Sequence, residues 1–218
     1  MLRWLDLLIY WFSKQVMRHY LASGLTIHVQ GLERIPERRA AILVANHPCA
    51  IDGWLLICLI ERKLFFFIRA EHVAHPLANW YVRMMDGLPV RSRADNRASL
   101  AVAEDVLRQS HLFAIFPEGN VTPGPTLLPF QNSFLLLAVK LDVPVIPIAI
   151  VGTHKALSDP IRPRTLSAFR LQPTEVHMAV LEPMLFHNPE LDPVLFAQHR
   201  EQVRQAIADK IHELATLC

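Results

Sequence analysis

The chain has few cysteines, few glycines and few charged residues for a length of 218. Its three cysteines, Cys49, Cys58 and Cys218, form an odd and widely spaced set. They therefore predict no disulfide framework and no metal motif, and they favour a reducing compartment. Only 7 glycines stand against 16 prolines, which indicates stiff loops rather than disorder.

Charged residues make up 19% of the chain and hydrophobic residues 52%, whereas an ordinary soluble domain carries about 25% charged residues. The net charge of +2 comes without a dense basic stripe, so we expect no nucleic-acid partner. No run approaches the roughly 20 apolar residues that cross a bilayer. The apolar excess must therefore fill the core of one globular domain or contact an apolar partner.

An amphipathic segment stands at the N-terminus. Trp4, Leu7, Leu8 and Trp11 recur at helical spacing, and Arg3, Lys14, Arg18 and His19 supply positive charge. Aromatic and basic residues on one helix are typical of a segment that lies in a membrane interface. The alternative is a terminal helix packed on the core. We expect an interfacial helix at 1–23, a globular domain at 24–218, and a peripheral or monotopic position on the cytoplasmic face of a membrane.

Apolar strands alternate with amphipathic helices along the rest of the chain. The expected strands are 26–30, 40–45, 64–68, 88–90, 111–116, 143–150 and 176–181. The expected helices are 54–60, 76–84, 95–109, 134–141 and a last one that Asp192 caps. This alternation predicts an α/β fold with a mostly parallel central sheet flanked by helices. In such sheets, ligands bind beyond the carboxyl ends of the strands.

A histidine and an aspartate stand at one of these strand ends. His47 follows the buried strand 40–45 directly, and Asp52 stands five residues later, near the start of a helix. A carboxylate on one ring nitrogen fixes the tautomer and makes the other nitrogen a better base. We therefore predict His47 as a general base and Asp52 as its partner. The alternatives are a helix-capping Asp52 beside a core His47, and a thiolate nucleophile at Cys49.

Two further segments follow strands in the same way. Arg91 and Arg93 stand in a basic turn after a short strand, and arginine suits bidentate phosphate binding. Phe116–Asn120 follows another buried strand and opens on the same sheet edge. Within it, Gly119 permits close approach of a ligand to the backbone, and Glu118 is suited to orient a hydroxyl or a basic group.

Together these segments resemble the glycerophospholipid acyltransferase family, which includes the 1-acyl-sn-glycerol-3-phosphate acyltransferases. The matching motifs are Asn-His-x4-Asp at 46–52, Gly-x-Pro-Val-basic at 87–91, Phe-Pro-Glu-Gly at 116–119 and Val-Pro-Val-Ile-Pro at 143–147. They stand in the family's order. The resemblance implies His47 as base with Asp52 as its partner, and an arginine at 91–93 on the acceptor phosphate. It also implies acceptor binding at 118–120, that is, by Glu118, Gly119 and Asn120.

The resemblance also implies a reaction. The family transfers a fatty acyl group from acyl-CoA or acyl carrier protein to a lysophospholipid hydroxyl at a membrane surface, without a cofactor. The first expected acceptor is 1-acyl-sn-glycerol 3-phosphate, which gives phosphatidic acid in phospholipid biosynthesis. Asn120 and Val121 stand where the family commonly has Thr and then Arg or Ser. Another lysolipid or an amino-acid-derived lipid therefore remains an alternative acceptor, and a thioesterase or a non-enzymatic lipid-binding protein an alternative function.

Two other groups of residues have the composition of a binding site. The basic, proline-rich segment 159–164 fits contact with anionic lipid or carrier phosphates as well as it fits a solvated loop. His72 and His75, beside Glu71, have the spacing of two helix-borne metal ligands. No further ligand stands near them in the sequence, so we expect no metal there.

Overall fold

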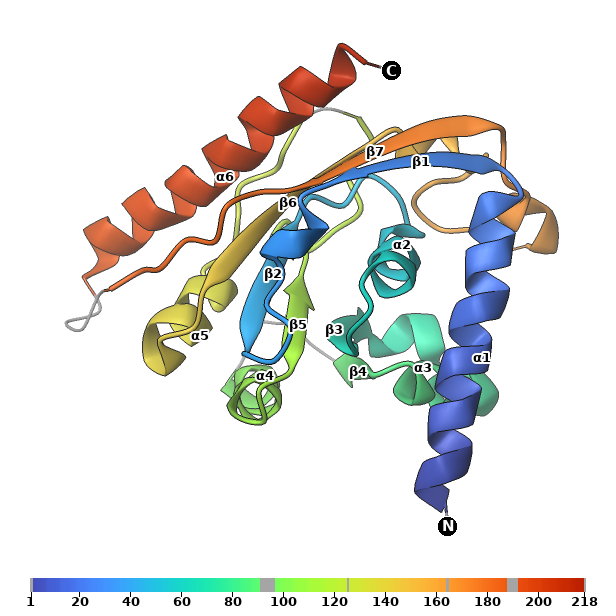
Figure 1. The fold of residues 1–218 in the computed structure, drawn as a ribbon, viewed down its shortest axis with the longest axis horizontal. Helices are drawn as coiled ribbons and strands as arrows, with labels where there is room; N and C mark the ends of the chain where they lie inside the picture. The colour runs from blue at the N-terminus through green and yellow to red at the C-terminus, as the bar shows by residue number, and fades with distance from the viewer. Residues whose placement is uncertain (1, 91–96, 125, 164, 188–191, 218) are drawn as a thin grey trace.

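A computed structural model describes residues 2–90, 97–124, 126–163, 165–187 and 192–217. Within these residues, seven strands form one sheet in the order β1-β7-β6-β2-β5-β3-β4 (Figure 1). The strands are β1 Leu25–Gln30, β2 Ala41–Ala45, β3 Leu64–Arg69, β4 Gly87–Val90, β5 Leu112–Ile115, β6 Val145–Val151 and β7 Thr174–Val180.

Helices cover both faces of the sheet (Figure 1). On one side lie α1 Leu2–Ala22, α2 Asp52–Leu59 and α3 Pro76–Met84, and on the other α4 Arg97–Arg108, α5 Ser133–Leu141 and α6 Pro193–Ala215. Short 3-10 turns are η1 Leu32–Arg34, η2 Ala70–Val73, η3 Thr153–Lys155 and η4 Leu166–Phe169. The predicted α/β fold is therefore confirmed. The Asp192 side chain caps α6 as expected, by accepting a hydrogen bond from the Val194 N–H at 2.9 Å.

The apolar run of β2 reflects burial on both faces. Ile42 and Val44 enter the core under α4, α5 and α6, whereas Leu43 enters the core under α1 and α2. All five residues of β2 are buried. A strand with this environment needs apolar side chains at every position rather than at alternate ones.

Strand direction sets where the ligand edge lies. β4, β3, β5, β2 and β6 pair in parallel, so their carboxyl ends meet at one edge of the sheet. β7 runs antiparallel to β6, and β1 runs parallel to β7. The segments that leave β2, β3 and β5 therefore start side by side, and two of them carry the predicted site motifs.

Helix α1 packs on the core through Tyr10 and Leu21, is also held by polar side chains, and exposes several large apolar residues. The Lys14 Nζ donates to the Ile60 carbonyl at 2.5 Å, and Arg18 donates to the Cys58 carbonyl at 2.8 Å. Trp4 and Phe12 are 77% and 71% exposed. None of the described helices combines the length and the apolar character needed to cross a bilayer. The structure contains the predicted N-terminal helix, and its place in a membrane interface stays a prediction.

Candidate active site

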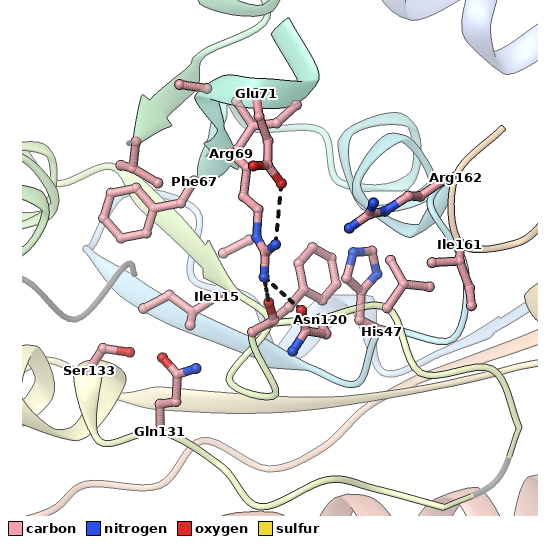
Figure 2. A pocket seen from close by; sticks show the side chains of 17 residues that line it. His47, Phe67, Arg69, Glu71, Ile115, Asn120, Gln131, Ser133, Ile161 and Arg162 are labelled. Atoms are coloured by element: carbon pink, nitrogen blue, oxygen red, sulfur yellow. Dashed lines mark hydrogen bonds and ion pairs between the residues drawn. The ribbon is translucent and has the colours of Figure 1, made fainter. Parts of the chain in front are cut away.

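A cleft of about 820 Å³ opens at the carboxyl ends of β2, β3 and β5 (Figure 2). Its walls come from segments that lie far apart in the sequence. Side chains that line it include His47, Arg69, Phe116, Asn120, Gln131 and Arg162. The cleft therefore lies where the strand directions place a ligand site.

The His47 and Asp52 side chains form a hydrogen-bonded pair at this cleft. The His47 Nδ1 lies 2.9 Å from the Asp52 Oδ2, which also accepts the Cys49 N–H at 2.7 Å. Asp52 is fully buried, whereas the His47 side chain is 18% exposed. The carboxylate favours the tautomer with the proton on Nδ1, so the Nε2 lone pair is left for a substrate proton.

Asp52 does not serve as the helix cap. The N-cap position of α2 belongs to Ile51, and Asp52 is the first helical residue. Its side chain points back to the loop and binds the imidazole and a loop amide instead of an amide of its own helix. The capping alternative considered from the sequence is therefore wrong, and the pairing with His47 predicted from the same residues is present.

The His47 ring and backbone are held on several sides. The Phe116 ring stacks on the imidazole, with ring centres 4.0 Å apart and planes 16° apart. The His47 carbonyl accepts the Thr122 N–H at 2.8 Å. One residue earlier, the buried Asn46 side chain donates to the Ile150 carbonyl at 2.8 Å and accepts the Ile150 N–H at 2.7 Å. His47 is thus fixed to β6 and to the loop after β5.

Glu118 lies behind His47 rather than among the residues that line the cleft. It is 5% exposed, and its two carboxylate oxygens accept the His47 N–H at 3.2 Å and the Leu128 N–H at 2.9 Å. These contacts join the His47 loop to the long loop after β5. The predicted role of Glu118 in acceptor binding stays a prediction, whereas its contacts assign it a positioning role.

Gly119 and Asn120 both line the cleft, as their motif predicts. Gly119 has a φ of +72°, and a Cβ on it would lie 2.4 Å from the Gln131 side-chain nitrogen. A larger residue is therefore strained at this position. The Arg69 guanidinium donates to the Gly119 carbonyl at 3.0 Å and to the Asn120 Oδ1 at 2.7 Å.

Two arginines stand at the cleft: Arg69 is not among the predicted site residues, and Arg162 belongs to the segment 159–164, which fits lipid or carrier contact as well as a solvated loop. Arg69 ends β3, and Figure 2 shows its contacts with Asn120 and Glu71. Arg162 comes from the basic segment after η3. The Pro160 carbonyl of this segment accepts the Ala50 N–H at 2.8 Å, which holds the segment near the His47 loop. Among the residues that the structure describes, these two carry the positive charge of the cleft wall.

The two arginines expected on the acceptor phosphate, Arg91 and Arg93, lie outside the described residues, as does Asp95, the first residue of the expected helix 95–109. Their predicted roles stay predictions. β4 ends at Val90, which lines the cleft.

Cys49 has the surroundings of an inert thiol. It is completely buried, and burial, followed by the nearby Asp52 carboxylate, raises its pKa to about 12. A thiol with this pKa is almost entirely protonated at neutral pH, so it is a poor nucleophile. The geometry therefore disfavours the Cys49 alternative.

We expect the Cys49→Ala variant to keep kcat within about threefold of the parent chain. The Asp52 carboxylate keeps its loop contact in this variant, because Cys49 donates through its backbone N–H. Initial rates of thioester consumption measure the effect. A loss above about 100-fold in a variant with unchanged circular dichroism would instead mark the thiol as a reacting group.

Comparison with known proteins places the chain in a family. The family model described as Acyltransferase matches residues 26–151, which hold the His47–Asp52 pair, Glu118 and Gly119. The chain belongs to the acyltransferase family. This result confirms the resemblance drawn from the four motifs.

Similar proteins carry related descriptions. The 1-acyl-sn-glycerol-3-phosphate acyltransferase of Cocos nucifera is 25% identical over 200 residues, covering 86% of this chain and 62% of its own length. That of Limnanthes alba is 26% identical over 165 residues, covering 74% of this chain and 55% of its own. The lyso-ornithine lipid O-acyltransferase of Rhodobacter capsulatus is 28% identical over 163 residues, covering 72% and 55%. The chain thus spans little more than half the length of these acyltransferases.

A solved structure agrees over most of the fold. The crystal structure of the 1-acyl-sn-glycerophosphate acyltransferase PlsC from Thermotoga maritima matches with a TM-score of 0.73 and 27% identity. The match covers 98% of this chain and 80% of that one. The acyltransferase-family fold therefore extends beyond the segment matched by the family model, to nearly the whole of this chain.

Proposed function

We propose that this acyltransferase-family chain transfers a fatty acyl group from a thioester carrier to the hydroxyl of a lysophospholipid. The proposed acceptor is 1-acyl-sn-glycerol 3-phosphate, and the product is phosphatidic acid. The observation that carries the proposal is the 2.9 Å contact between His47 Nδ1 and a fully buried Asp52 carboxylate at an open cleft. An imidazole in this arrangement is prepared to take a proton at Nε2.

The proposed reaction needs no covalent enzyme intermediate. The acceptor hydroxyl binds beside His47, which takes its proton through Nε2 as the oxygen attacks the thioester carbonyl. The Asp52 carboxylate stabilises the imidazolium that forms. When the tetrahedral intermediate collapses, the carbon–sulfur bond breaks and the imidazolium proton passes to the leaving thiolate of CoA or of the carrier protein, which now lacks its acyl group. A positioned general base of this kind contributes about 10²–10⁴-fold to the rate.

We further propose that the acceptor phosphate lies against the arginines of the cleft. Arg69 and Arg162 line the cleft wall with His47, and Arg91 and Arg93 follow the cleft residue Val90 in the sequence. Arginine binds a phosphate through two parallel hydrogen bonds, which also fixes its orientation. Because Arg69 is already held by Asn120 and Glu71, it offers a preorganised donor group.

An amino-acid-derived lysolipid is the second candidate acceptor. The cleft wall contains the carboxylate of Glu71 beside Arg69, and a carboxylate suits the ammonium group of an ornithine head group. A lyso-ornithine lipid O-acyltransferase stands among the relatives. The Glu71 carboxylate and the similarity to this relative favour an ornithine lysolipid, whereas the number of arginines favours an acceptor with a phosphate group.

Product analysis separates these candidates. The chain is incubated with palmitoyl-CoA or palmitoyl-acyl carrier protein and with lysophosphatidic acid, lyso-ornithine lipid or no acceptor, and the products are identified by mass spectrometry. We expect phosphatidic acid with lysophosphatidic acid, and a rate at least about tenfold lower with the ornithine lipid. Thiol release at the same rate without acceptor would identify a thioesterase, and acceptor binding without turnover would identify a lipid-binding protein.

We also propose that the chain acts as a peripheral protein at a membrane surface, with an interfacial helix at 1–23 and the acyltransferase domain at 24–218. Trp4, Leu8 and Phe12 of α1 are exposed, and so are Leu77 and Trp80 of α3, a helix that α1 contacts. Apolar side chains exposed on neighbouring helices favour insertion among lipid head groups. The reducing environment suited to the free, buried Cys49 and Cys58 favours the cytoplasmic face.

Vesicle binding tests the interfacial helix. We expect the Phe12→Asp variant to bind phosphatidylglycerol-containing vesicles about 10–100-fold more weakly than the parent chain, because inserting one large apolar side chain contributes about 1.5–3 kcal/mol. Co-sedimentation measures the partition coefficient. The control is Val102→Asp, on the opposite face of the sheet, where the valine is 44% exposed. Equal effects of the two variants would argue against the proposal.

A further inference from the structure

Three potential metal ligands meet on the edge of the sheet, away from the cleft. His28 on β1 and His177 on β7 are direct neighbours in the parallel ladder. Glu175 stands two residues before His177, so it projects from the same face of β7. One ligand atom from each of the three residues can be chosen so that all lie within 4.8 Å of one another. None of the three lines the cleft, and the proposed reaction uses none of them.

His177 is the unusual member of this cluster. It is only 7% exposed, and its Nε2 has no hydrogen-bond partner among the described residues. A buried polar atom of this kind normally has a partner, because leaving it unpaired costs free energy. By contrast, His28 and Glu175 are exposed. The cluster thus combines one fixed, buried imidazole with two ligands that can be reached from solvent.

We propose that His28, Glu175 and His177 bind one divalent transition-metal ion, with Zn²⁺ as the first choice. Imidazole nitrogens suit Zn²⁺, Ni²⁺ and Cu²⁺, whereas Mg²⁺ and Ca²⁺ favour sites built from oxygen ligands alone. Two histidines and one glutamate are a known zinc ligand set, and they leave a fourth position for water or another ligand. The exposed side of this cluster supplies such a position.

Binding requires one movement. The two rings now stack, with centres 4.7 Å apart and planes 18° apart. Because the lone pair of an imidazole nitrogen lies in the ring plane, nearly parallel stacked rings do not direct their lone pairs at one point. His28 is exposed and free to turn its ring, whereas His177 is held in the sheet. The ion therefore draws the His28 ring out of the stack.

The bound ion joins the edge strand to its neighbour. β1 is the edge strand and pairs with β7 alone in the sheet of the described residues. It also connects α1 to the rest of the fold. An ion bound by both strands stabilises the folded chain, because the unfolded chain does not hold these ligands together.

Titration with Zn²⁺ tests this proposal directly. We expect isothermal titration calorimetry of the full chain to show one saturable site. Thermal unfolding should shift upward by roughly 5–10 °C at a free Zn²⁺ concentration about 100 times the dissociation constant. The His28→Asn and Glu175→Gln variants change exposed side chains. Each should raise the dissociation constant for Zn²⁺ by at least about 10–100-fold, which is the loss in affinity that follows removal of a residue supporting a metal ligand.

His187→Asn is the matched control, because His187 is an exposed histidine outside the cluster. It should leave the isotherm and the thermal shift unchanged. Co²⁺ gives an independent readout, since visible absorption bands of a low-coordinate site should appear with the parent chain and disappear in His28→Asn. The proposal is overturned by the absence of a saturable site, by a His28→Asn isotherm equal to that of the parent, or by equal losses in His28→Asn and His187→Asn.

Discussion

The His47→Ala variant should lose about 10²–10⁴-fold in kcat for acyl transfer, because it lacks the proposed general base for the acceptor hydroxyl. KM values should change by only a few-fold, since His47 is one of many residues that line the cleft. The Asp52→Asn variant should lose a comparable factor. Its amide can donate to Nδ1, which would place the imidazole proton on Nε2, the nitrogen that must accept.

Initial rates with saturating acyl donor and varied acceptor measure both variants. His212→Ala is the control, because His212 is exposed on α6 on the opposite side of the sheet. Circular dichroism and thermal unfolding show whether each variant is folded. A folded His47→Ala variant that retained more than about a tenth of the parent kcat would rule out His47 as the base.

The Glu118→Gln variant carries the second large expected effect. In the parent chain each Glu118 carboxylate oxygen accepts one N–H, one from His47 and one from Leu128. Glutamine replaces one of these oxygens by an NH2 group, so one of the two N–H groups loses its acceptor. A hydrogen bond to a charged group contributes about 1.5–3 kcal/mol. We therefore expect a fall of that size in the free energy of unfolding, and a roughly 10–100-fold fall in kcat as the His47 loop shifts.

The positioning role and the acceptor-binding role of Glu118 predict different kinetics. A positioning residue lowers kcat and the midpoint of urea unfolding together, without a selective rise in KM for the acceptor. An acceptor-binding residue raises KM for the acceptor and leaves unfolding unchanged. Glu213→Gln, at an exposed glutamate of α6, controls for the loss of one negative charge. Unchanged stability with a raised acceptor KM would reject the positioning role.

Local patterns in the sequence predict much of this architecture. The apolar run at 40–45 indicates a strand buried on both faces, and β2 is such a strand. The stripe of Phe196, Val203, Ile207, Ile211 and Leu214 predicts the buried side of α6. The pairing of His47 with Asp52 is equally local, because only the four residues 48–51 separate them. In each case the signal lies within one element or one connection.

The features that the sequence does not reveal depend on strand order. Glu118 lies 71 residues from His47 in the chain, and its contact arises because β5 lies beside β2. Arg69 is the last residue of β3, a phenylalanine-rich strand whose pattern predicts core packing. It reaches the cleft because β3 pairs with β5 and β4. The histidines of the proposed metal site meet because β1 pairs with β7. No periodicity within one segment encodes such neighbours.

The carboxamide of Asn46 has a consequence for how rigidly His47 is held. Its donor and acceptor saturate both backbone groups of Ile150, just beyond the last paired residues of β2 and β6, Ala45 and Ile148. The main chain can therefore turn away from the sheet at residue 47 without leaving the backbone N–H and C=O of Ile150 unpaired. The proposed base is consequently anchored from two directions, from the protein interior through β6 and from the loop after β5 through Glu118 and Thr122.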